Sequence, residues 1–195
     1  YMINEEDYCT PQVFSSAEDF LKKNKDEDNW LLQIECFDPH EPFHSPKRFR
    51  NLYPTDYNGP ILDWPVYERV KESPEEISEI RANYASLVTM VDEYFGKLLD
   101  FFDTHGLWDD TAIIVTTDHG FLLGEHDWWA KNRMPVYDEI AHIPLMIYHP
   151  DFLSQKGQRR EALTQTIDIM PTLLEMFDIQ APSDVSGKSL MTTLG

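Results

Sequence analysis

The sequence predicts an α/β fold, a sandwich of helices on a largely parallel sheet. Three apolar runs of strand length lie at residues 30–37, 111–117 and 144–149, and segments with helical periodicity separate them. Strands that alternate with helices in this order favour parallel pairing. With 195 residues the chain is long enough for one domain with a sizeable core.

The first predicted helix follows Ser15-Ser16-Ala17-Glu18, which resembles a capping box, and it carries Phe20 and Leu21 on one side. It ends in the charged run 22–28, which is typical of a solvated helix end and loop. In residues 30–37 both odd-numbered and even-numbered positions carry apolar side chains, as in a strand of a sheet that is covered on both faces.

Residues 38–74 contain seven prolines and many aromatic residues and predict a long irregular segment. Segments of this length without secondary structure of their own are often functional loops. Ser73-Pro74-Glu75-Glu76 then begins a long amphipathic helix, with a cap residue, a proline in the first position and acids in the first turn. The helix is predicted to end near Thr104-His105-Gly106, and its apolar stripe is interpreted as core packing.

The last predicted elements are the strands at 111–117 and 144–149 and a helix at 167–177, with Pro171 near its first turn. The two cysteines, Cys9 and Cys36, could form one disulfide but make no disulfide framework. For Cys36, inside an apolar run, a buried reduced thiol is the favoured interpretation.

The chain carries a net charge of −19, from 16 basic and 35 acidic residues. Such a charge repels nucleic acid and anionic membranes, and no apolar run approaches the ~18–20 residues that span a bilayer. It also repels anionic substrates, so an anion site needs strong local positive charge, which a metal together with Lys131 and Arg133 could supply within the ~10 Å Debye length.

The segment 111–131 carries the first candidate site. A strand ends at Asp118-His119, and Gly120 turns the chain directly afterwards. Ligands of open α/β sheets bind at the carboxyl ends of strands, so these side chains are candidate metal ligands. The alternative is that Asp118 caps a turn and His119 packs on the surface, and a short motif does not separate the two.

Two further residues belong to the candidate site. His40 follows the strand at 30–37 and stands in Pro39-His40-Glu41-Pro42, where the prolines restrict the backbone, so it is an acid or base candidate. Lys131 follows two tryptophans that could exclude water and strengthen its attraction for an anionic oxygen. The alternatives are a surface loop histidine and a solvated lysine.

Together these motifs resemble the type I sulfatases of the alkaline phosphatase superfamily, from about residue 15 to residue 195. The motifs that carry the resemblance are Pro39-His40-Glu41-Pro42-Phe43, Thr116-Thr117-Asp118-His119-Gly120, Leu123-Gly124-Glu125-His126, Trp129-Ala130-Lys131, Ile143-Pro144-Leu145, Asp168-Ile169-Met170-Pro171-Thr172-Leu173-Leu174 and Gly187-Lys188-Ser189-Leu190. The resemblance implies the alkaline phosphatase and sulfatase type of fold, with residues 1–195 forming the central to C-terminal part of the catalytic domain.

The resemblance also implies a role for each residue. Asp118 would be a ligand of the active-site divalent cation, and His119 matches the next ligand position. His40 would bind the sulfate ester and help to protonate the leaving group, Lys131 would contact a sulfate oxygen and the ester bridge, and His126 would line the substrate pocket. The metal of such enzymes is usually calcium. Because calcium prefers oxygen ligands, His119 could instead have an outer role or favour manganese or zinc.

The formylglycine nucleophile of the family matures from a Cys/Ser-x-Pro-x-Arg motif. Cys9-Thr10-Pro11-Gln12-Val13 matches its first three positions, but Val13 replaces the arginine and the context is wrong, so Cys9 is rejected. Tyr1-Met2-Ile3 resembles neither a natural start nor a signal peptide. We therefore expect a chain cut from a longer one, without the nucleophile region, the paired aspartate ligands and the C-terminal small sheet. By itself it is expected to be inactive, to bind metal weakly or not at all and to self-associate through exposed apolar sheet surface.

The resulting hypothesis is a sulfuric ester hydrolase that acts on a small-molecule or carbohydrate sulfate ester. One alternative is a phosphonate or phosphodiester hydrolase of the same superfamily, which shares the metal pocket. Another is a non-catalytic binding protein, against which the joint presence of His40, Asp118, His119 and Lys131 argues. The sequence assigns no cellular compartment.

Overall fold

The computed structural model describes residues 2–195, and the chain divides into two compact units. Unit 1 comprises the residues up to Leu107 together with His119–Ile143. Unit 2 comprises Trp108–Asp118 and Pro144–Gly195. Tyr1, where the sequence suggests a cut in a longer chain, lies outside the described residues.

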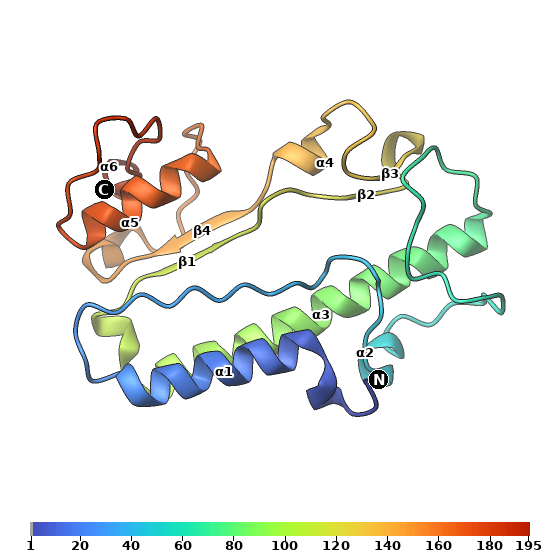
Figure 1. Cartoon of the computed structure of the whole chain (residues 1–195), viewed down its shortest axis with the longest axis horizontal. Helices are drawn as coiled ribbons and strands as arrows, with labels where there is room; N and C mark the ends of the chain where they lie inside the picture. The colour runs from blue at the N-terminus through green and yellow to red at the C-terminus, as the bar shows by residue number, and fades with distance from the viewer. Residues whose placement is uncertain (1) are drawn as a thin grey trace. The chain divides into compact units, whose positions relative to one another are not determined.

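Unit 1 is mostly helical and irregular. Its elements are a 3₁₀ helix at Glu5–Asp7, α1 (Cys9–Asn24), α2 (Lys47–Arg50), α3 (Pro74–His105), β2 (Leu122–Leu123), a 3₁₀ turn at Glu125–Asp127, β3 (Trp129–Ala130) and α4 (Asp138–Ala141). Helix α1 packs along α3, and Figure 1 shows the two running in the same direction. The predicted irregular segment at 38–74 contains α2, short turns and one isolated β-bridge, between Arg69 and Trp128.

Helix α3 begins and ends where the sequence predicts. At its start, Ser73 Oγ accepts a hydrogen bond from the Glu76 amide at 3.3 Å, and the Glu76 carboxylate accepts one from the Ser73 amide at 2.7 Å. At its end, Gly106 adopts a left-handed conformation with φ 70°, which glycine takes without steric cost. Both signals are local, and the predicted helix is confirmed.

The apolar stripe of α3 lies in the core of unit 1, as predicted. The core consists of six buried side chains from α3, the long irregular segment and β3: Phe43, Phe49, Ile80, Leu87, Met90 and Trp129. Burying one such side chain completely contributes about 1.5–3 kcal/mol. The core therefore joins β3 and the residues just after His40 to one helix.

Helix α1 begins before its predicted start. It starts at Cys9, and Ser15 and Ser16 lie inside it. Ser16 Oγ donates to the Gln12 carbonyl at 2.9 Å instead of capping the helix. Pro11 does not prevent the earlier start, because an amide in the first turn of a helix has no intrahelical partner to lose.

The prediction of a strand at 30–37 is wrong for the described residues. A strand requires backbone hydrogen bonds to a neighbouring strand, and residues 30–37 form no such ladder. The segment is nevertheless extended and runs along α1 (Figure 1). Side chains hold it there: Trp30 packs edge-on against Phe20 with ring centroids 5.8 Å apart, and Cys36 Sγ lies 3.0 Å from Thr10 Oγ1. Exposure alternates along the segment, so only one face is covered.

Parallel strand pairing is also wrong for the described residues, although helix and sheet are both present. β1 (Ile113–Thr116) pairs antiparallel with β4 (Leu145–Tyr148), with Ile113 opposite Tyr148 and Thr116 opposite Leu145. β2 and β3 form a second antiparallel pair. The residues between β1 and β4 contain no helix longer than α4, and a parallel pair needs a full crossover connection.

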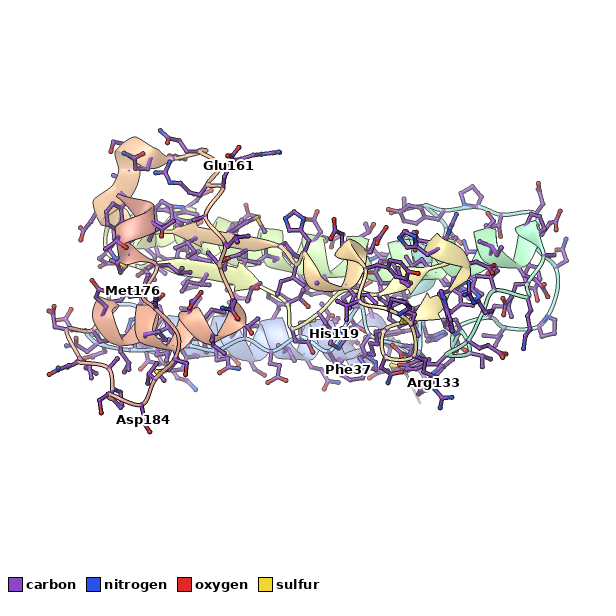
Figure 2. All side chains as sticks on the ribbon, turned by 90° about the horizontal axis from the view of Figure 1, so that it is seen from above. Phe37, His119, Arg133, Glu161, Met176 and Asp184 are labelled. Atoms are coloured by element: carbon purple, nitrogen blue, oxygen red, sulfur yellow. The ribbon has the colours of Figure 1, made fainter. Side chains whose placement is uncertain are left out.

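Unit 2 contains β1 and β4 and the C-terminal helices. Its other elements are 3₁₀ turns at Pro150–Gln155 and Thr166–Asp168, α5 (Ile169–Met176) and α6 (Met191–Leu194); a further turn, Leu107–Asp109, lies at the junction of the units. The predicted helix at 167–177 is confirmed as α5, which ends at Met176 (Figure 2). The buried Asp168 carboxylate accepts hydrogen bonds from the amides of Gln165 and Lys188, both at 2.8 Å, and so fixes the C-terminal segment.

Both cysteines are free thiols, so the disulfide alternative is excluded. Burial raises the pKa of the Cys36 thiol, in agreement with the interpretation of an unreactive reduced side chain. Among residues 2–195, none of the helices combines the length and the apolar composition that crossing a bilayer requires.

Candidate functional site

His40 and Lys131 meet in unit 1. Lys131 Nζ lies 2.7 Å from His40 Nε2. The Lys131 side chain is only 12% exposed and the His40 side chain 36% exposed. Lys131 is therefore not a solvated surface lysine, and His40 is held in a defined environment instead of projecting freely from a loop.

The chain on either side of His40 fixes the imidazole. The His40 amide donates to the Phe37 carbonyl at 3.0 Å, which closes a turn at the end of the extended segment. The His40 ring packs on the Phe37 ring with centroids 4.5 Å apart. Just beyond it, Phe43 is buried in the core of unit 1. The histidine thus stands between a packed aromatic ring and an anchored core residue.

Strand β3 positions Lys131. Trp129 is completely buried, and its Nε1 donates to Glu72 Oε2 at 2.6 Å. Ala130 has φ 77°, a left-handed conformation that is unusual for a residue with a Cβ. Its burial in β3 holds this conformation, and Lys131 follows directly. The aromatic ring that lies near Lys131 Nζ is that of Phe121, with the centroid 5.7 Å away.

A buried carboxylate lies beside the pair. The Glu41 side chain is completely buried, with Oε2 3.6 Å from Lys131 Nζ and 3.3 Å from His40 Nδ1. Its other oxygen, Oε1, accepts a hydrogen bond from the Tyr67 hydroxyl. Oε2 makes no hydrogen bond. The carboxylate therefore interacts with the two basic groups through charge.

The surroundings shift the pKa of both acidic groups. Burial alone would raise the pKa of Glu41, but the Tyr67 hydrogen bond, a hydrogen bond from its own backbone and the charge of Lys131 outweigh it, and the net pKa is lowered. Burial and the hydrogen bond to Glu41 raise the pKa of Tyr67 to about 12. At neutral pH, Glu41 is thus an anion and Tyr67 a neutral donor.

The contacts assign the tautomer of His40. Lys131, as an ammonium group, can only donate, so His40 Nε2 accepts from it. His40 Nδ1 then carries the proton and points to the Glu41 carbonyl at 2.8 Å. A cation and an imidazole in contact can bind an anionic oxygen and exchange a proton with it.

His119 lies in unit 1 and is labelled in Figure 2. Its Nδ1 lies 2.9 Å from the Gly120 carbonyl, which favours the tautomer with a lone pair on Nε2, as metal ligation requires. Gly120 approaches the backbone so closely that a Cβ there would lie 1.7 Å from the Glu139 carbonyl oxygen. The glycine of the Asp-His-Gly motif is therefore required by packing.

Asp118 lies in unit 2, two residues after the end of β1, as predicted. Its Oδ1 accepts a hydrogen bond from Thr117 Oγ1 at 3.3 Å. Within residues 2–195, no group of three or more histidine, cysteine or acidic side chains is arranged to hold a metal ion. One carboxylate and one imidazole do not fit calcium, which takes ~6–8 oxygen ligands, without further donors.

His126 has different partners. Its ring stacks on Tyr137 with centroids 3.9 Å apart and planes 8° apart, and Nε2 lies 3.1 Å from both carboxylate oxygens of Glu139. A backbone hydrogen bond and then the His126 contact lower the pKa of Glu139. These contacts join His126 to α4 and the residue before it.

Two residues beside the His40–Lys131 pair, Glu41 and Tyr67, have no role that the sequence predicts. Glu41 stands between His40 and Pro42 and is followed by core residue Phe43, and an acid in such a position is a signal for burial. Tyr67 gives no comparable signal, because it lies in the long irregular segment 26 residues away from Glu41.

Comparison with known proteins gives a consistent result. The sequence profile of the family described as Sulfatase matches residues 2–179. The chain is 28% identical to an arylsulfatase of Clostridium perfringens over 197 aligned positions, covering 93% of the chain and 40% of the relative. It is 38% identical to the N-acetylglucosamine-6-O-sulfatase of Bacteroides thetaiotaomicron, covering 57% of the chain and 20% of the relative.

The fold is similar to that of a phosphonate monoester hydrolase from Silicibacter pomeroyi. The TM-score is 0.76 at 28% identity, and the match covers 99% of this chain and 42% of the other. This likeness confirms the predicted α/β fold of alkaline phosphatase and sulfatase type. The chain spans less than half the length of each of these three proteins.

Proposed function

The chain belongs to the sulfatase family, and on this basis we propose that it contributes to an enzyme that hydrolyses a sulfate ester. The observation that supports the proposal most strongly is the contact of 2.7 Å between Lys131 Nζ and His40 Nε2 beside the buried Glu41 carboxylate. Hydrolysis of a sulfate ester requires positive charge at the sulfate oxygens and a proton for the leaving oxygen. A lysine and a histidine in contact can supply both.

We propose that Lys131 binds a sulfate oxygen and the ester bridge, and that His40 protonates the leaving group. Lys131 is shielded from water, which strengthens its attraction for an anion. With a net charge of −19 the chain repels anions at long range, so binding depends on such local cations. In the state described above, His40 Nε2 accepts from Lys131. The acid therefore requires a second proton on the imidazole once the substrate has engaged the lysine.

We further propose that Asp118 and His119 are two ligands of a divalent cation, calcium by analogy with the family. When bound, the cation would supply positive charge to the sulfate oxygens. The carboxylate at the end of β1 and the tautomer of His119 are compatible with this role. The remaining ligands and a formylglycine nucleophile would come from outside these residues. His126 is proposed to face the substrate.

For the substrate we propose a sulfated carbohydrate. One relative, 38% identical over 57% of the chain, is named as an N-acetylglucosamine-6-O-sulfatase. The alternative is a phosphonate or phosphodiester hydrolase, which the structural similarity to a phosphonate monoester hydrolase supports. The His40–Lys131 pair suits either anion, so the sulfate assignment depends on the family.

The test uses the protein as its gene encodes it, purified with its metal. Turnover of 4-nitrophenyl sulfate, N-acetylglucosamine 6-sulfate and 4-nitrophenyl phenylphosphonate is compared for the wild type and for His40→Ala. Sulfate esters are expected to be the better substrates, and His40→Ala to lose most of the turnover. His105→Asn, at the C-terminus of α3, is the matched control. Faster phosphonate turnover would establish the alternative, and unchanged turnover in His40→Ala would exclude the catalytic role.

A further inference from the structure

We propose that Glu41 is a positioning residue, whose buried carboxylate is the counter-ion that allows His40 to hold a proton on Nε2 beside the Lys131 ammonium. Nothing in the sulfate chemistry described above assigns Glu41 a role. The inference rests on the proposed function only for its consequence in turnover, because the counter-ion itself can be measured without a substrate.

A protonated His40 and the Lys131 ammonium would place two positive charges side by side. An imidazolium in contact with an ammonium at 2.7 Å is strongly disfavoured, because two cations repel at that distance. Without a nearby negative charge, the doubly protonated imidazole that an acid requires would face the ammonium uncompensated. Either the lysine or the histidine would have to be neutral.

The Glu41 carboxylate places a negative charge beside both basic groups. Glu41 Oε2 lies 3.3 Å from His40 Nδ1 and 3.6 Å from Lys131 Nζ, so a single carboxylate oxygen serves both basic groups. The aromatic side chains of Phe37 and Phe121 also contact the pair, and neither carries charge. Within residues 2–195, the titratable side chains that contact the Glu41 carboxylate are those of His40, Lys131 and Tyr67.

The two carboxylate oxygens of Glu41 have different environments. Tyr67 donates to Oε1, whereas Oε2 has no hydrogen bond and is completely buried. A glutamine could satisfy Tyr67 equally well and would not bury a charge. The burial of a charged oxygen that makes no hydrogen bond therefore points to an electrostatic function, directed at His40 and Lys131.

The decisive experiment is an NMR pH titration of the His40 imidazole in the 195-residue chain, with its signal assigned by its loss in His40→Gln. Glu41→Gln is expected to lower the midpoint of His40 by about one pH unit or more. Glu41→Asp, which keeps the charge, is expected to restore most of the difference. The control is Glu79→Gln, which removes a half-buried carboxylate paired with Arg50 and should leave the midpoint unchanged. An unchanged midpoint in Glu41→Gln, or an equal shift in the control, would overturn the proposal.

A second variant covers the case in which Glu41→Gln does not fold. Lys131→Met removes the competing cation and leaves the Glu41–imidazolium pair, so the midpoint of His40 should rise. A midpoint that does not rise would overturn the proposal independently.

The consequence for turnover is tested separately in the enzyme as encoded. Glu41→Gln should lower kcat, leave KM nearly unchanged and move the high-pH limb of the profile to lower pH. A moved NMR midpoint with an unmoved pH profile would retain the counter-ion and exclude His40 as the acid, which distinguishes failure of the proposed function from failure of this inference.

Discussion

Lys131 Nζ contacts His40 Nε2 at 2.7 Å, although 91 residues separate the two in the chain. His40 lies in a turn after an extended segment, and Lys131 follows β3. Both the residues after His40 and β3 pack into the same core against α3. The contact therefore depends on the fold of unit 1 and not on any local motif.

The first prediction concerns this contact. His40→Ala and Lys131→Ala should each lower kcat for a sulfate ester by about 10²-fold or more, the range of a general acid or charged contact. Since the two side chains touch, the double variant should lose less than the product of the single losses. A double-mutant cycle on kcat/KM measures this coupling. Losses that multiply would show that the residues act independently.

The second prediction concerns Arg48, which holds Glu93 and Glu5 together. Its hydrogen bond lowers the pKa of Glu93 from 4.5 to about 2. A depressed carboxyl pKa contributes stability above the unfolded pKa, and this contribution is lost as the pH falls through the folded pKa. Arg48→Met should therefore cost about 1 kcal/mol at pH 7, discounted for the exposure of the pair. The difference should shrink between pH 4.5 and about 2.

Urea unfolding of both proteins at several pH values measures this difference. The exposed Arg159, changed to methionine, is the control and should show no such pH dependence. A cost for Arg48→Met that stays constant down to pH 2 would contradict the electrostatic origin.

The sequence predicts a feature of the fold well when that feature depends on residues close together in the chain. The boundaries of α3 follow from Ser73 and Gly106, whose effects are confined to one turn, and both are predicted correctly. The start of α1 is missed, because Ser15 and Glu18 resemble a capping box although they lie inside the helix. Strand direction depends on residues far apart in the chain, and the two strand pairs of the described residues are antiparallel where parallel pairing is predicted.

The candidate site shows the same division. His40 and Lys131 are named from motifs, but their contact follows only from packing in unit 1. Glu41 is visible in a motif without a role, and Tyr67 reaches it across 26 residues through the irregular segment. Charge interactions of this kind leave no periodic pattern that a sequence could reveal.

The third prediction concerns the core of unit 1. Leu87 in α3 is completely buried, and its neighbour Val88 is 42% exposed. Leu87→Ala should lower the free energy of unfolding by about 2–5 kcal/mol, because it removes apolar burial and leaves a cavity. Val88→Ala should change it by less than about 0.5 kcal/mol. Urea denaturation followed by circular dichroism compares the two variants. Equal losses of unfolding free energy would contradict the assignment of Leu87 to the buried face of α3 and Val88 to its exposed face.

The fourth prediction concerns Gly120, directly after His119. A Cβ at Gly120 would lie 1.7 Å from the Glu139 carbonyl oxygen, and the Gly120 amide also donates to the Ile140 carbonyl at 2.9 Å. The nearest atoms belong to the backbone of residues 139 and 140 and no flexible side chain is among them, so Gly120→Ala should cost at least about 2 kcal/mol. Gly59→Ala is the matched control, since its Cβ would meet only the end of the Tyr57 side chain, which can rotate away at little cost. Thermal and urea unfolding of the two variants separate a rigid clash from a flexible one. If both glycines tolerated alanine equally, the backbone contact between residues 120 and 139 would not constrain the segment that carries His119.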